Sequence, residues 1–203
     1  TPLLFSGLDA AVVGSLGAEL ERFGMVALQV GGGQRAPGAA ATTPPRFEDG
    51  GAIGVQLMRG DILATAIGTV THVAGDRLVA FGHPMMYAGQ IALPTATARV
   101  LHVLANERRS FKIAETTAPL GALVHDRQAA IVVDTGLVAE TVPVRVRVEG
   151  VVGAPRTEWN VEVASHRMLT PMLAFGSILN AIETTSTDRS DVVFEVTTRA
   201  EVE

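Results

Sequence analysis

The residue with the clearest chemical potential is His83, which lies between Gly82 and Pro84. The preceding residues, 77–81, have the composition of a short strand, so the histidine is expected where that strand ends. Gly82 permits a sharp change of backbone direction, and Pro84 biases the residue before it toward an extended conformation. Such a histidine would sit at the rim of a sheet with restricted freedom, which suits a general base. The alternative is a turn histidine that hydrogen-bonds to a loop carbonyl, and the spacing alone favours this alternative.

Two further residues could complete a nucleophilic site. Asp126 is the candidate carboxylate that would orient His83, although a solvated role in a turn beside Arg127 fits its position better. Ser177 follows a glycine and is the candidate nucleophile, but it lies within the apolar stripe of an expected helix. A small packing residue is the simpler interpretation of Ser177.

The sequence predicts no metal site and no cofactor. His72, Asp76 and His83 could be combined into a zinc site, but no His-x-His or His-Glu-x-x-His pattern supports it. The glycines at 31–33 lack the Gly-Lys-Ser/Thr of a phosphate-binding loop, so we interpret them as a flexible linker. We expect His72 and His102 to be hydrogen-bonded histidines of the sheet or core.

Composition limits the class of protein. The chain has 203 residues, of which 47% are hydrophobic, enough for one domain or two small ones. Its net charge of −5 argues against nucleic-acid binding, which needs a basic surface. The absence of cysteine excludes a disulfide scaffold and a thiol nucleophile, and no apolar run is long enough for a transmembrane helix. Because it starts at Thr1 without a leader pattern, we expect a processed product or a piece of a longer protein.

The pattern of apolar residues predicts a mainly β fold with two flanking helices. The N-terminal part, 1–30, should hold a helix capped by Ser6 and ended by Gly24, followed by a strand at 25–30. Residues 31–51 form a Gly/Ala/Pro-rich loop or linker, and 52–203 form a β domain. Its strands are expected at the following ranges: 52–58, 63–67, 69–73, 77–81, 129–133, 142–148, 159–163 and 194–202.

Local signals refine three of these elements. Gly75 and Asp76 predict a hairpin turn, and Pro143 predicts an edge strand. A second helix is expected at 171–184 behind Thr170 as its N-cap. Its apolar stripe, expected to be buried, consists of Met172, Phe175, Leu179 and Ile182.

Ordered blocks of this sequence resemble the SpoIVB-type peptidase domain, the S55 family of serine peptidases. The first set of blocks consists of Gly60-Asp61, Thr69-Val70-Thr71, Gly75-Asp76-Arg77 and Ala80-Phe81-Gly82-His83-Pro84. The second set consists of Ser110-Phe111-Lys112-Ile113, Pro119-Leu120-Gly121-Ala122-Leu123 and His125-Asp126-Arg127. The likeness covers about residues 52–148.

The resemblance implies a β-barrel or sandwich of trypsin-like type, from an exported or cell-envelope protein of bacteria. It also implies that His83 is the general base that activates a serine for peptide hydrolysis. The Gly-x-Ser-Gly-Ser-Pro block that carries the serine in the family is missing, since Ser165, Ser177, Ser186 and Ser190 lack its glycine-flanked turn. The other hypothesis is therefore a non-catalytic binding or scaffold module, or a subunit of an envelope assembly, with a peptide or protein partner. The oligomeric state stays open.

Overall fold

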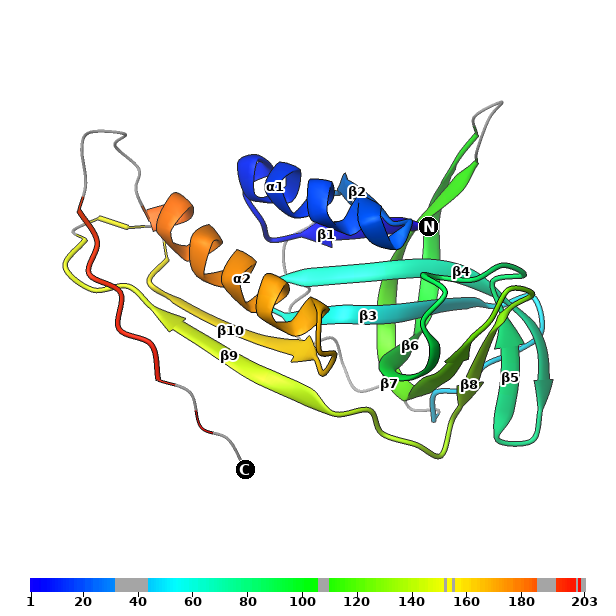
Figure 1. The fold of residues 1–203 in the computed structure, drawn as a ribbon. Coiled ribbons are helices and arrows are strands. Elements are labelled where there is room, and N and C mark those ends of the chain that lie inside the picture. Colours follow the sequence, from blue (N-terminus) through cyan, green and yellow to red (C-terminus); the bar gives the residue numbers. More distant parts are fainter. Residues whose placement is uncertain are drawn as a thin grey trace.

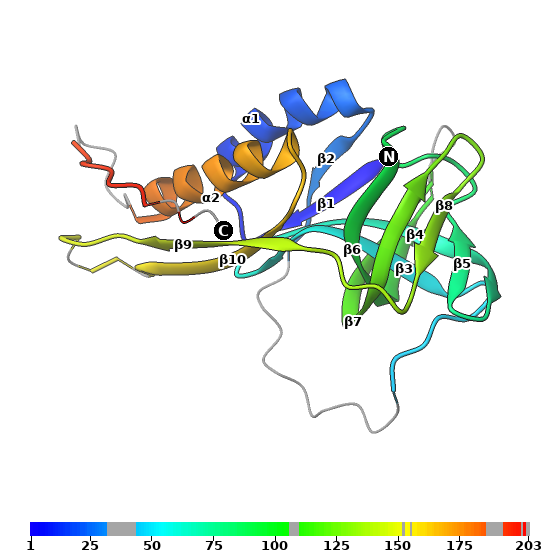
Figure 2. The same ribbon diagram turned by 60° about the horizontal axis from the view of Figure 1, so that its bottom comes forward.

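The computed structural model describes residues 1–31, 44–105, 110–151, 153–154, 156–185, 193–199 and 201. In this part of the chain ten strands join into one continuous sheet, and two helices lie together on one of its faces (Figures 1 and 2). The expected fold class, mainly β with two helices, is confirmed. Neither of the described helices is both long enough and apolar enough to cross a bilayer.

Six strands close into a barrel. Each pairs antiparallel with the next around the ring, and β3 closes it because it pairs with β4 on one side and β6 on the other. Aliphatic side chains from the ring, such as Ile53, Leu123 and Val133, are fully buried in the core. In order around the ring the strands are β3 (Ala52–Gly60), β4 (Leu63–Ala74), β5 (Arg77–Ala80), β8 (Ile131–Asp134), β7 (Phe111–Asp126) and β6 (Gly89–Leu104).

The hairpin of β3 and β4 extends beyond the barrel into an open sheet. There β4 pairs with β1 (Pro2–Ser6), which is parallel to β2 (Val26–Gln29). On the other side β3 pairs with β10 (Glu158–Ala164), which pairs with the edge strand β9 (Thr141–Arg147). The helices α1 (Ala10–Leu20) and α2 (Leu169–Thr185) cover one face of this open sheet (Figure 2).

Several local predictions are confirmed. The turn at Gly75 and Asp76 joins β4 to β5 in register, with Val73 opposite Leu78. Pro143 lies on an edge strand, where the missing amide removes no ladder bond inside the sheet. Gly24 ends the first helical segment in a left-handed conformation, after the 3-10 turn Glu21–Phe23.

Other predictions are wrong. The N-cap of α1 is Asp9, whose carboxylate accepts from the amide of Ala11 at 2.8 Å, whereas Ser6 ends the unpredicted strand β1. The ranges 63–67 and 69–73 form one strand. The strand expected at 194–202 is absent from 193–199 and 201, and most of the expected linker 31–51 lies outside the described residues.

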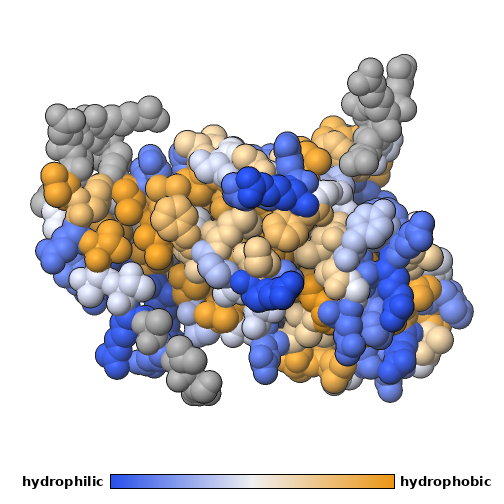
Figure 3. Space-filling model, viewed as in Figure 1, coloured by the Kyte–Doolittle hydropathy of each residue, from blue (hydrophilic) through white to orange (hydrophobic). Residues whose placement is uncertain are grey.

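The second helix is turned relative to the prediction. It begins at Leu169, so Thr170 lies inside the first turn, and its inward face carries Gly176 and Asn180. The stripe expected to be buried is only half-buried: Phe175 is 62% exposed, whereas Met172 and Leu179 pack partly buried against the core. Apolar side chains gather over α2 in Figure 3. The most buried face of α2 therefore lies beside the expected stripe, on Leu173, Gly176 and Asn180.

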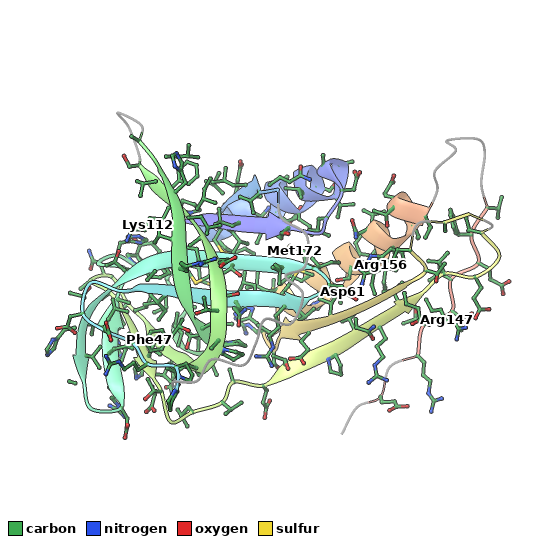
Figure 4. The ribbon with its side chains drawn as sticks, turned by 180° about the vertical axis from the view of Figure 1, so that it is seen from behind. Phe47, Asp61, Lys112, Arg147, Arg156 and Met172 are labelled. Carbon is green, nitrogen blue, oxygen red and sulfur yellow. The ribbon has the colours of Figure 1, made fainter. Side chains whose placement is uncertain are left out.

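The long strands β6 and β7 were not predicted as such. Their hairpin crosses the face of β3 and β4 that lies opposite the helices (Figure 4). Lys112 of β7 donates to the hydroxyl of Thr69 on β4 at 2.5 Å, and Gly54 of β3 leaves room for Thr116. This crossing forms one wall of a groove described below.

Candidate active-site loop

His83 lies in the loop 81–88, which joins β5 to β6 and begins with an unusual backbone. Phe81 has φ +73°, Gly82 +71° and Tyr87 +60°, and the left-handed region is rare for bulky aromatic residues. The ring of Phe81 lies directly on Gly68 of β4, where any Cβ would collide with it. Such strained backbone positions persist only where the surrounding structure holds them in place, and they are found most often at functional sites.

The imidazole of His83 is exposed and has a defined orientation. Its Nδ1 lies 2.7 Å from the carbonyl oxygen of Pro84, and its ring is 5.5 Å from that of Phe81. A carbonyl oxygen only accepts, so Nδ1 donates and the neutral ring keeps its lone pair on Nε2. The hydrogen bond from His83 to a loop carbonyl, which the alternative interpretation predicted, is thus present. It leaves Nε2 available as a base.

Asp126 acts on the backbone of this loop. Its carboxylate is 2% exposed and accepts from three amides: Met85 at 2.7 Å, Met86 at 2.8 Å and Ala88 at 3.0 Å. No hydrogen bond joins it to His83, so it does not orient the ring as the candidate carboxylate would. Its role in this structure is to position the segment after His83.

Ser177 is not placed with His83. It lies on the inner face of α2, is fully buried, and its hydroxyl donates to the carbonyl of Leu173 at 3.0 Å. Ser165 is exposed after β10, while Ser186 and Ser190 lie outside the described residues. In the part of the chain that the structure describes, no serine hydrogen-bonds to His83.

His72 and His102 lie on strands of the sheet and not in the core. His72 is exposed, with its Nδ1 3.0 Å from Asp49, and His102 is exposed on β6. The hydrogen bonds from His72 and from the amide of Val73 hold the pKa of the Asp49 carboxyl below its ordinary value. Within the described ranges, no three His, Asp or Glu side chains gather as a zinc site requires.

A groove of about 610 Å³ was missed by the sequence analysis. It lies on the face of β3 opposite the helices and shares no lining residue with the loop 81–88. Its most buried polar side chain is Gln56, whose position in an apolar strand gave no sign of a site. From the sequence alone, a single Gln or Arg in a strand is interpreted as a solvent-exposed residue. Its part in a site becomes visible only when the neighbouring strands are known.

No family model, curated protein or solved structure matches the chain. The resemblance to the S55 peptidases therefore remains a prediction based on the sequence blocks described above.

Proposed function

We propose that the chain is the histidine-bearing part of a serine-type peptide hydrolase similar to the S55 family, with His83 as general base. The observation that carries the proposal is the orientation of this ring: Nδ1 is bonded to Pro84, and Nε2 is left free on an exposed, strained loop. A general base needs this arrangement, because one nitrogen must be fixed in tautomer while the other accepts the proton.

In the proposed reaction His83 Nε2 takes the proton from a serine hydroxyl as its oxygen bonds to the scissile carbonyl carbon. The same proton then passes to the leaving amine as the peptide C–N bond breaks, and a water molecule hydrolyses the acyl-enzyme in the reverse order. The serine must come from residues other than Ser177, which is buried in α2. Export to the bacterial cell envelope belongs to the same proposal and rests on the resemblance alone.

The proposal is tested on the full-length parent protein with a fluorophosphonate probe and casein as substrate. We expect labelling and cleavage that His83→Ala abolishes and His72→Ala, a second exposed histidine, leaves unchanged. A full-length protein that neither labels nor cleaves casein would contradict the proposal.

The second candidate function is a non-catalytic binding module. It is favoured by the absence of a serine bonded to His83 in the described chain and by the groove beside β3. In that case the parent protein stays unlabelled by fluorophosphonate and retains a peptide or protein partner.

A further inference from the structure

The groove opens where β3 changes its pairing partner. Pairing with β6 ends at Val55 opposite Thr95, and pairing with β10 begins at Met58 opposite Val163. Between these points the barrel and the open sheet diverge, and the register shift after Gln56 marks the bulge that permits it.

The walls of the groove come from distant parts of the chain. Thr116–Pro119 of β7 form one wall, and Pro143–Arg145 of β9 with Asn160–Glu162 of β10 form the other. The region lies between the crossing hairpin and the β9–β10 pair in Figure 4. Its volume of about 610 Å³ is within the usual size of ligand pockets, roughly 300–1,000 Å³.

The side-chain oxygen of Gln56 lacks a hydrogen-bond partner in the described structure. The residue is 5% exposed, and its Oε1 is buried without a partner in the described structure. Its Nε2 donates only to the hydroxyl of Thr116, over a long 3.4 Å. A buried amide oxygen without a partner is unfavourable, and a ligand N–H would supply the missing donor.

The charges of the groove leave one cation unpaired. Arg59 donates to the carboxylate of Glu162 at 2.6 Å, and both line the groove. Asp61, also in the lining, pairs at 2.5 Å with Arg156, which lies outside it. Arg145 makes no ion pair with any residue that the structure describes. The groove therefore complements a ligand with a carboxylate.

We propose that this groove binds an extended peptide with an acidic side chain. A backbone N–H of the peptide donates to Gln56 Oε1, the carboxylate pairs with Arg145, and aliphatic side chains contact Pro119 and Pro143. This site goes beyond the proposed function, because it includes neither His83 nor its loop.

Two pooled libraries of fluorescein-labelled hexapeptides test the proposal, one with a fixed Glu and one with a fixed Lys at the third position. Fluorescence polarisation should show binding of the Glu pool and binding about tenfold or more weaker for the Lys pool. Arg145→Glu should weaken binding of the Glu pool by about tenfold or more, because it removes the cation.

Arg147→Glu is the matched control. Arg147 lies two residues along β9, outside the groove, and pairs with Glu149 at 3.2 Å. The substitution Arg147→Glu changes the net charge by the same amount as Arg145→Glu. Equal losses of peptide affinity in the two variants would therefore overturn the proposal, as would absence of binding to the wild type.

Gln56→Leu should weaken peptide binding without lowering the melting temperature, and a His83→Ala variant should bind the peptide like the wild type. Loss of peptide binding in His83→Ala would show that the peptide binds at the loop of His83 and not in the groove, which would overturn the proposal.

Discussion

At the scale of single residues, the loop that carries His83 depends on one carboxylate. Asp126 is almost completely buried and accepts from the backbone amides of Met85, Met86 and Ala88, at distances of 2.7 to 3.0 Å. These amides would otherwise lack hydrogen-bond partners, because the loop is not paired with a neighbouring strand at these residues. The carboxylate thus holds the backbone on both sides of Tyr87, one of the two aromatic residues of the loop with positive φ.

Asp126→Asn should therefore destabilise the fold by about 2–3 kcal/mol, because an amide offers one accepting oxygen in place of two and no charge. Urea unfolding measures the loss. Asp76→Asn is the control, since only the backbone oxygen of Asp76 takes part in hydrogen bonds with the residues that the structure describes, and it should change the stability little. Equal stability of the two variants would contradict the role given to Asp126.

At the scale of elements, α2 shows why the apolar stripe of a helix need not be its most buried face. Its inward residue Gly176 lets Leu16 of α1 approach to 2.9 Å from where a Cβ would stand. Asn180 also faces inward, accepts from the amide of Asp9 at 2.7 Å and donates to the carbonyl of Gly7 at 3.1 Å. Small size and hydrogen bonding decide the packing here, and neither is visible in the periodicity of the sequence.

The N-terminus of α2 should make stability depend on pH. His166 Nδ1 accepts from the amides of Met168 and Leu169 at 3.3 and 3.2 Å, which requires an unprotonated nitrogen. Burial, and then the charge of Arg167, hold the pKa of His166 below its ordinary value of 6.5. As the pH falls below 6.5, the unfolded chain takes up the proton first, so the free energy of unfolding decreases until the folded pKa is passed.

The measurement compares melting temperatures of wild type and His166→Asn between pH 8 and pH 5. Asparagine caps helices without titrating, so the variant should match the wild type at pH 8 and lose less stability toward pH 5. Parallel curves over the whole range would show that the cap does not depend on protonation.

At the scale of the whole molecule, short-range signals predicted the elements that obey a simple period. Val142, Val144 and Val146 alternate with polar residues, and the structure places a strand there. Strands β6 and β7 escaped prediction because their pairing contains four register shifts, each of which breaks the alternation. Closure of the barrel depends on β3 pairing with two partners, and this long-range choice leaves no local trace in the sequence.

The candidate site was predictable only in part. The local sequence Gly82-His83-Pro84 predicts a conformationally constrained histidine. The hydrogen bonds that Asp126 accepts from the loop could not be predicted, because Asp126 lies about 40 residues later in the chain. The groove beside β3 could not be predicted, since its walls come from β7, β9 and β10, which meet only in the folded chain.

The orientation of the His83 imidazole is measured most directly by long-range ¹⁵N–¹H NMR of the labelled protein at a pH where the ring is neutral. We expect the proton on Nδ1, where it is donated to the carbonyl of Pro84, and no proton on Nε2. A neutral ring with its proton on Nε2 would contradict this expectation, because the nitrogen proposed as the base would then have no lone pair to accept a proton.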